Sequence, residues 1–121
     1  MAEDAAKVAA AYFDAWRAKD FGTLRSLLAD DVEYQGPLAH TDSADACLRA
    51  LEGASALTTD LVIQKTFVAD ADVLTWFALH TEIAPVTPVA NWMSVRNGKI
   101  ARIRAIYDPR ELIREASAAG D

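Results

Sequence analysis

The stretch that most restricts what this chain can fold into is residues 72–82, which read DVLTWFALHTE. Period-two alternation with β-branched and aromatic residues predicts a β-strand, whose side chains divide into two sets on opposite faces. One set comprises Leu74, Trp76, Ala78, His80 and Glu82, and the other comprises Val73, Thr75, Phe77, Leu79 and Thr81. The first set changes from apolar to polar along the strand. Such a face could line a pocket that has reactive groups at one end. His80, one of two histidines in the chain, is therefore a candidate functional residue.

Composition and charge exclude several classes of protein. At 121 residues the chain is long enough for one domain with a single core. Its net charge of −6 opposes binding to nucleic-acid phosphates. Because it has neither a leader-like N-terminus nor an apolar run of about 18 residues, we expect a soluble, cytoplasmic protein without a membrane partner. The single cysteine, Cys47, excludes an internal disulfide, and two distant histidines make a poor metal-ligand set, so no metal or other cofactor is expected.

The first half of the chain is predicted to be mainly helical. Apolar residues recur every four positions within residues 5–19, which predicts an amphipathic helix. A second short helix follows, and residues 32–35 form a short strand that Gly36-Pro37 ends. After a loop through His40, Asp42 or Ser43 is expected to cap a third helix, which Gly53 is placed to end.

The second half is predicted to form long strands at residues 59–68, 72–82, 89–96 and 99–107, with an irregular connection at 83–88. Asn97-Gly98 indicates a tight hairpin, because both central positions of a type I′ turn need positive φ. Asp108-Pro109 indicates a last helix, and residues 117–121 are expected to fray. Helices followed by an antiparallel meander predict an α+β fold, in which a strongly curved sheet and the N-terminal helices form a cone-shaped barrel.

This order of elements, with YFDAWRAKDFGTLRSLLADDVEYQGP early and RNGKIARIRAIYDPRELI late, resembles the SnoaL-like superfamily. That superfamily shares the cone-shaped fold of nuclear transport factor two. The resemblance extends from about Val8 to Leu112, so residues 1–121 are expected to form a single SnoaL-like domain. The superfamily includes ketosteroid isomerases, polyketide cyclases and limonene epoxide hydrolases. The resemblance is therefore specific for the fold but not for the reaction.

Among these enzymes, the bacterial ketosteroid isomerases give the closest match. Their oxyanion-donor tyrosine on the first helix matches Tyr12, and their second donor, an aspartate on the third long strand, matches Asn91, whose amide can still donate. Their general base, an aspartate before the proline that ends the first strand, is replaced by Gly36. The Asp-Arg-Asp arrangement of the epoxide hydrolases is not found. Asp108 lies near the acidic position of the cyclases, but helix capping explains it.

The same alignment implies a set of residues that line the pocket. It places Trp76, Ala78 and His80 on the inward face of their strand. The residues expected to bind the ligand are Trp16, Tyr34, Leu51, Leu57, Trp76, Ile103 and Tyr107. His80 is the candidate catalytic base because histidine exchanges protons near physiological pH, and Tyr12 and Asn91 would stabilise negative charge on oxygen. His80 could instead be a buried neutral imidazole with a structural hydrogen bond.

The outer face of the sheet is expected to carry Trp92, Arg96, Arg102 and Arg104, together with Phe77 and Leu79. An exposed face of this kind usually marks an interface, and SnoaL-like proteins commonly dimerise through it, so a homodimer is expected. The predicted function is binding of a hydrophobic, cyclic small molecule resembling a steroid or polyketide, with cofactor-free isomerase, cyclase or hydrolase chemistry if the protein is catalytic. The alternatives are a non-catalytic ligand-binding or accessory module, and a protein-interaction scaffold whose cone is filled.

Overall fold

The computed structural model describes residues 2–114, with side chains from residue 4 onward. Its helices are α1 (Ala2–Ala18), α2 (Phe21–Leu27) and α3 (Ala44–Ser55), and residues 110–114 are also helical. Ser43 caps α3 as expected, because its hydroxyl oxygen accepts a hydrogen bond from the Ala46 N–H at 3.2 Å. α3 continues past Gly53. Within residues 2–114 every helix is too short or too polar to span a bilayer. The expected fraying of residues 117–121 lies outside the described residues.

Six strands form one sheet in the order β2-β1-β6-β5-β4-β3. Their bounds are β1 Leu28–Gln35, β2 His40–Thr41, β3 Thr58–Ala69, β4 Asp72–Thr81, β5 Thr87–Arg96 and β6 Lys99–Ile106. All neighbours are antiparallel except β1 and β6, which are parallel. β1 begins four residues before the predicted strand, and the segment predicted as a loop through His40 pairs with the end of β1.

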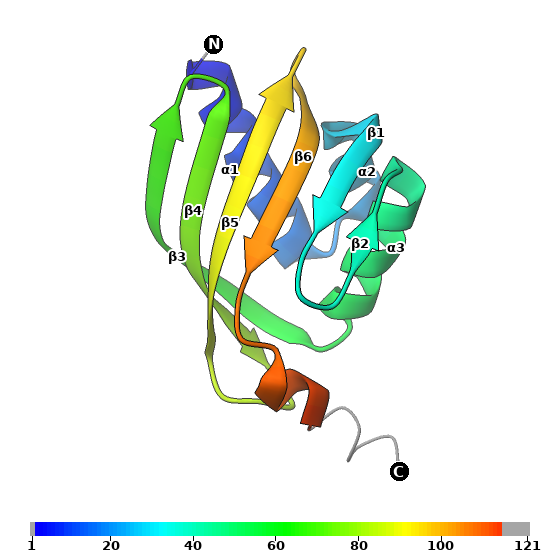
Figure 1. Ribbon diagram of the computed structural model, residues 1–121, viewed down its shortest axis with the longest axis vertical. Coiled ribbons are helices and arrows are strands. Elements are labelled where there is room, and N and C mark those ends of the chain that lie inside the picture. The colour runs from blue at the N-terminus through cyan, green and yellow to red at the C-terminus, as the bar shows by residue number, and fades with distance from the viewer. Residues whose placement is uncertain (1, 115–121) are drawn as a thin grey trace.

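Two tight turns connect the long strands. Asn97 and Gly98 have φ of 54° and 75°, which confirms the predicted hairpin between β5 and β6. Asp70, with φ of 55°, turns the chain from β3 into β4. Both turns lie at the same end of the sheet, and the helical segment after β6 lies at the other end (Figure 1).

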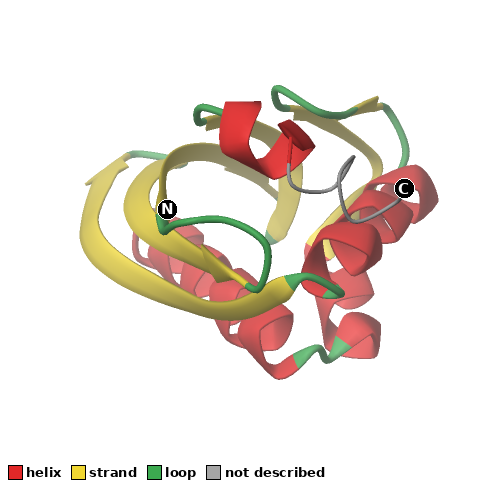
Figure 2. Ribbon diagram, turned by 90° about the horizontal axis from the view of Figure 1, so that it is seen from below, coloured by secondary structure: helices red, strands yellow, loops and turns green. Residues whose placement is uncertain are grey.

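The sheet is strongly curved, and α1 packs against its concave face (Figure 2). Register shifts in the β5–β6 and β3–β4 pairs mark bulges, which bend a sheet and increase its twist. α3 lies beside β1 and closes one side of the cone (Figure 2). The predicted α+β fold, a cone-shaped barrel of a curved sheet and N-terminal helices, is confirmed.

The inward face of β4 is the reverse of the prediction. Phe77 is 2% exposed and its ring packs against those of Phe13 and Trp16, with centroids 5.2 and 6.3 Å apart. Trp76, the next residue along, is 44% exposed on the convex face. The inward set is therefore Val73, Thr75, Phe77 and Leu79, all of which are buried. The alternation is confirmed, but the predicted inward position of Trp76 and His80 is wrong, as is the outward position of Phe77 and Leu79.

Candidate functional site

A cavity of about 410 Å³ lies between α1, α3 and the concave face of the sheet. Its walls are mostly aliphatic and aromatic, and the polar groups come from a few side chains. The lining comprises Tyr12, Trp16, Tyr34, Leu38, Ala39, Arg49, Ala50, Leu51, Gly53, Ala54, Phe77, Leu79, Val89, Asn91, Ala105 and Tyr107. Within the described residues, the lining holds no carboxylate and no imidazole, and Arg49 is its one charged side chain.

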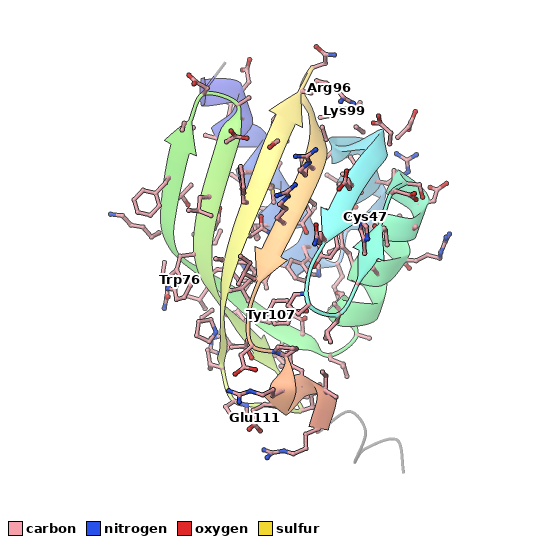
Figure 3. All side chains as sticks on the ribbon, in the orientation of Figure 1. Cys47, Trp76, Arg96, Lys99, Tyr107 and Glu111 are labelled. Atoms are coloured by element: carbon pink, nitrogen blue, oxygen red, sulfur yellow. The ribbon has the colours of Figure 1, made fainter. Side chains whose placement is uncertain are left out.

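Three tyrosines supply hydroxyl groups to this lining. Tyr12, on the buried face of α1, packs edge-on against Phe13 with ring centroids 5.1 Å apart. Burial raises the pKa of Tyr12 well above its ordinary value, and Tyr34 nearby adds to the shift. Burial, followed by the proximity of Tyr107, also raises the pKa of Tyr34. Burial raises the pKa of Tyr107, at the end of β6 (Figure 3). All three phenols are therefore neutral donors at physiological pH, and none is a base there.

Gly36 allows the ring of Tyr34 to lie back over the end of β1. A Cβ at position 36 would come within 3.2 Å of the Tyr34 hydroxyl oxygen and 3.3 Å of its ring. Most Cβ contacts are longer than this, so a side chain at position 36 would require the Tyr34 ring to shift by a few tenths of an ångström. The position that aligns with the aspartate base of the isomerases thus lies against a phenol that is held neutral.

Two buried polar atoms in the lining have no hydrogen-bond partner among the described residues. They are the indole Nε1 of Trp16, a donor, and Oδ1 of Asn91, whose amide group carries both donors and an acceptor. An unpaired buried polar group costs about 1–3 kcal/mol, so such groups are usually satisfied in the working state of a protein. Both atoms belong to side chains that line the cavity.

Comparison with known proteins identifies the family. The model of the SnoaL-like domain matches residues 9–103, which is most of the chain. The chain belongs to the SnoaL-like family. No curated protein matches this SnoaL-like chain significantly in sequence.

Solved structures share the fold of this SnoaL-like domain. A Kribbella flavida protein is 25% identical with a TM-score of 0.87, and the match covers 94% of each chain. A Mycobacterium tuberculosis LEH-like epoxide hydrolase is 21% identical with a TM-score of 0.78, over 98% of this chain and 96% of the other. Another Kribbella flavida protein, provisionally named a ketosteroid isomerase, is 17% identical with a TM-score of 0.80, over 88% and 79%.

The SnoaL-like domain brings six of the predicted site residues together around the cavity: Tyr12, Trp16, Tyr34, Leu51, Asn91 and Tyr107. Four others lie elsewhere. Trp76 and His80 are on the convex side of β4, Leu57 is 38% exposed beyond the end of α3, and Ile103 is fully buried in the core without reaching the cavity. The predicted pocket positions of these four residues are wrong. The physical reason for the first two is the reversed face of β4.

Sequence reasoning missed Phe77, Leu79, Val89 and Arg49 as lining residues. A usable signal exists for part of this set. Asn91 pairs directly with Thr75 across β4 and β5, and directly paired residues share a sheet face. With Asn91 inside, alternation along β4 also places Phe77 and Leu79 inside.

Glu82, the remaining polar residue of the predicted pocket, lines a separate hollow of about 290 Å³. Trp16 borders both spaces, and Ser55 contributes a buried hydroxyl without a partner in the described chain. Among residues 2–114, no three His, Cys, Asp or Glu side chains gather closely enough to hold a metal ion.

The raised tyrosine pKa values predict a loss of stability at alkaline pH. Tyrosines of the unfolded chain lose their protons near pH ~10. The buried phenols keep theirs, so the unfolded state binds fewer protons and stability falls as pH rises through and above that value. Tyr34→Phe is expected to reduce this fall, as measured by urea unfolding between about pH 8 and about pH 11. Parallel pH profiles for the two proteins would contradict the assignment.

Proposed function

We propose that this SnoaL-like domain binds a hydrophobic, cyclic small molecule that carries at least one hydrogen-bond-accepting oxygen, and that it acts as a binding module. The observation that carries the proposal is the composition of the cavity lining. Apolar walls surround a space of about 410 Å³, which is within the usual range of about 300–1,000 Å³ for small-molecule sites. The polar groups are mainly neutral donors, which suit a ketone, quinone or ester oxygen.

The same lining argues against base-catalysed isomerisation or cyclisation in this cavity. A general base must be within hydrogen-bond reach of the proton it removes and must be unprotonated at working pH. Gly36 stands at the aligned base position, the tyrosines are held protonated, and His80 lies on the convex side of β4. The LEH-like epoxide hydrolase and the provisionally named ketosteroid isomerase share the fold with this chain. For this chain we nevertheless propose binding without turnover.

The test combines a binding screen with a turnover assay. A panel of steroid ketones and tricyclic aromatic ketones is expected to raise the melting temperature, because a ligand at about 100 times its Kd adds about 2.7 kcal/mol to stability. A β,γ-unsaturated ketosteroid is expected to isomerise no faster than in buffer, followed by the absorbance of the conjugated enone. Turnover that His80→Ala abolishes would replace the proposal with the isomerase alternative. Absence of binding across the panel would overturn it.

We also propose that the convex face joins two copies of the chain. The outer sheet patch, defined as Phe67, Leu74, Trp76, Trp92 and Ile106, has exposed fractions between 43% and 73%. These residues form two neighbouring rows across the strands. In the first row, Phe67 pairs with Leu74 and Leu74 pairs with Trp92. In the second row, Ala90 pairs with Trp76 on one side and with Ile106 on the other. Such a contiguous apolar surface with two tryptophans is typical of an interface.

The cytoplasmic location expected from the sequence stays a prediction.

Trp92→Asp is expected to convert a homodimer into a monomer, because it places a charge at the centre of the outer sheet patch. Light scattering at micromolar concentration measures the mass of both proteins. Ile113→Asp is the matched control, because Ile113 is exposed to a similar extent but lies in the helical segment after β6. A wild-type protein with the mass of a monomer would refute the proposed dimer.

A further inference from the structure

Arg49 is the one charged side chain in the lining of the cavity within the described residues. It lies midway along α3, the helix that closes one side of the cone, and it is exposed to solvent. Every other lining residue is apolar or carries a neutral polar group. The packing of an apolar wall does not require an arginine. A cation in this lining is therefore a specific feature of the cavity.

Arg49 makes no ion pair and no hydrogen bond with the rest of the described chain, although acids are close in sequence. Asp45 lies four residues earlier on α3, a spacing that commonly forms an ion pair. Its carboxylate instead accepts a hydrogen bond from Nε of Arg25 at 3.1 Å. Glu52, three residues later, also forms no ion pair with Arg49. The guanidinium therefore keeps its donors free, on a residue that contributes to the cavity lining.

The charge of Arg49 is not offset inside the cavity. The lining holds no carboxylate among the described residues, so no acidic side chain inside the cavity neutralises the guanidinium. The chain as a whole carries a net charge of −6, which repels anions in general. Attraction of an anion into this cavity would therefore come from Arg49 locally. A guanidinium fork pairs with a carboxylate through two parallel N–H···O bonds, which gives direction as well as charge.

We infer that the ligand of this cavity is an amphiphilic carboxylic acid, whose apolar ring system fills the cavity and whose carboxylate pairs with Arg49 at the rim. This inference rests on the proposed binding function and specifies its ligand class. The neutral donors inside, from the three tyrosines and Trp16, then serve an uncharged oxygen on the body of the ligand. The chemistry is that of a ring compound with one acidic substituent.

The experiment compares two fluorescent probes of the same shape, pyrene-1-carboxylic acid and pyrene-1-carboxamide, at neutral pH and low ionic strength. Fluorescence titration gives the Kd of each probe for the wild type, for Arg49→Gln and for Arg102→Gln. Arg102 is the matched control, because it is an exposed arginine on β6 that does not line the cavity. The wild type and the control are expected to bind the acid about tenfold more tightly than the amide, a difference of about 1.4 kcal/mol.

In Arg49→Gln this preference is expected to disappear or reverse, because the net negative charge of the chain then disfavours the acid. Binding of the amide should weaken far less than binding of the acid, and cooperative urea unfolding shows that the variant is folded. Arg49→Lys should retain part of the preference, since it keeps the charge but loses the fork. Equal Kd values for the two probes in the wild type, or a preference that survives in Arg49→Gln, would overturn the inference and leave the binding function intact. If neither probe nor any ketone of the panel binds, the proposed function itself fails.

Discussion

Replacing Phe77 with alanine is expected to lower the free energy of unfolding by about 3–5 kcal/mol. Phe77 is almost fully buried, and its ring packs against Phe13 and Trp16 between α1 and the sheet. Removing the ring loses the free energy gained by burying it away from water, together with its edge-on aromatic contacts. It also leaves a space that the surrounding structure can only partly fill. Urea unfolding with the m-value held equal measures the effect.

Trp76→Ala is the control, because Trp76 neighbours Phe77 in sequence but lies half-exposed on the convex face. Its expected cost is below about 1.5 kcal/mol when only one partly exposed side chain is lost. Both substitutions should be made in the Trp92→Asp background, so that contacts between copies do not add to the cost of losing Trp76. If Trp76→Ala proved more destabilising than Phe77→Ala, the face of β4 that carries Trp76 would be the inward one.

The second large effect is expected on ligand binding, from Ala105→Phe. Ala105 lies on the cavity wall in β6, directly paired with Asn91 of β5. A benzyl group at this position projects into the cavity beside the Asn91 amide, so it takes the space of the ligand without entering the close-packed core. We expect affinity for the steroid ketones to fall by at least about 100-fold, or about 2.7 kcal/mol.

The matched control for this variant is Ile106→Phe, one residue along β6. Ile106 is 73% exposed on the convex face, so the same side chain is introduced there without entering the cavity. Binding should be unchanged in the control, and both variants should keep cooperative unfolding. Unaltered binding in a folded Ala105→Phe protein would show that the ligand site is elsewhere.

Local signals in the sequence predict much of this fold. Ser43 caps α3, and Asn97-Gly98 forms the turn of the β5–β6 hairpin, because each needs only a short-range contact or a backbone conformation. The early start of β1 and the short strand β2 depend on pairing with distant segments. No local pattern around His40 specifies that pairing.

The reversed face of β4 has a specific physical cause. Alternation divides the strand into two sets, but only the position of the helices decides which set is buried. Both sets are apolar in this chain, because the outer sheet patch contributes Leu74 and Trp76 while the core takes Phe77 and Leu79. The usual contrast between an apolar inner and a polar outer face is therefore missing.

Tyr12 on α1, Leu51 on α3 and Asn91 on β5 could be predicted as site residues, whereas the lining residues of β4 and Arg49 of α3 could not. Tyr12 and Asn91 follow from the alignment of whole elements with the family, which is insensitive to local choices of face. Arg49 gives no signal in the sequence, because an arginine on the surface of an amphipathic helix usually faces solvent. Its position on the cavity depends on how α3 lies against β1.

The most direct test of the cavity as the binding site uses the three tryptophans of the chain. Trp16 borders the cavity with its indole Nε1 unpaired, while Trp76 and Trp92 lie in the outer sheet patch. Their indole N–H groups give separate signals in a ¹H–¹⁵N correlation spectrum, which Trp→Phe variants assign. Titration with a steroid ketone is expected to shift the Trp16 signal and leave the other two in place. Shifts confined to Trp76 and Trp92 would contradict a ligand in the cavity.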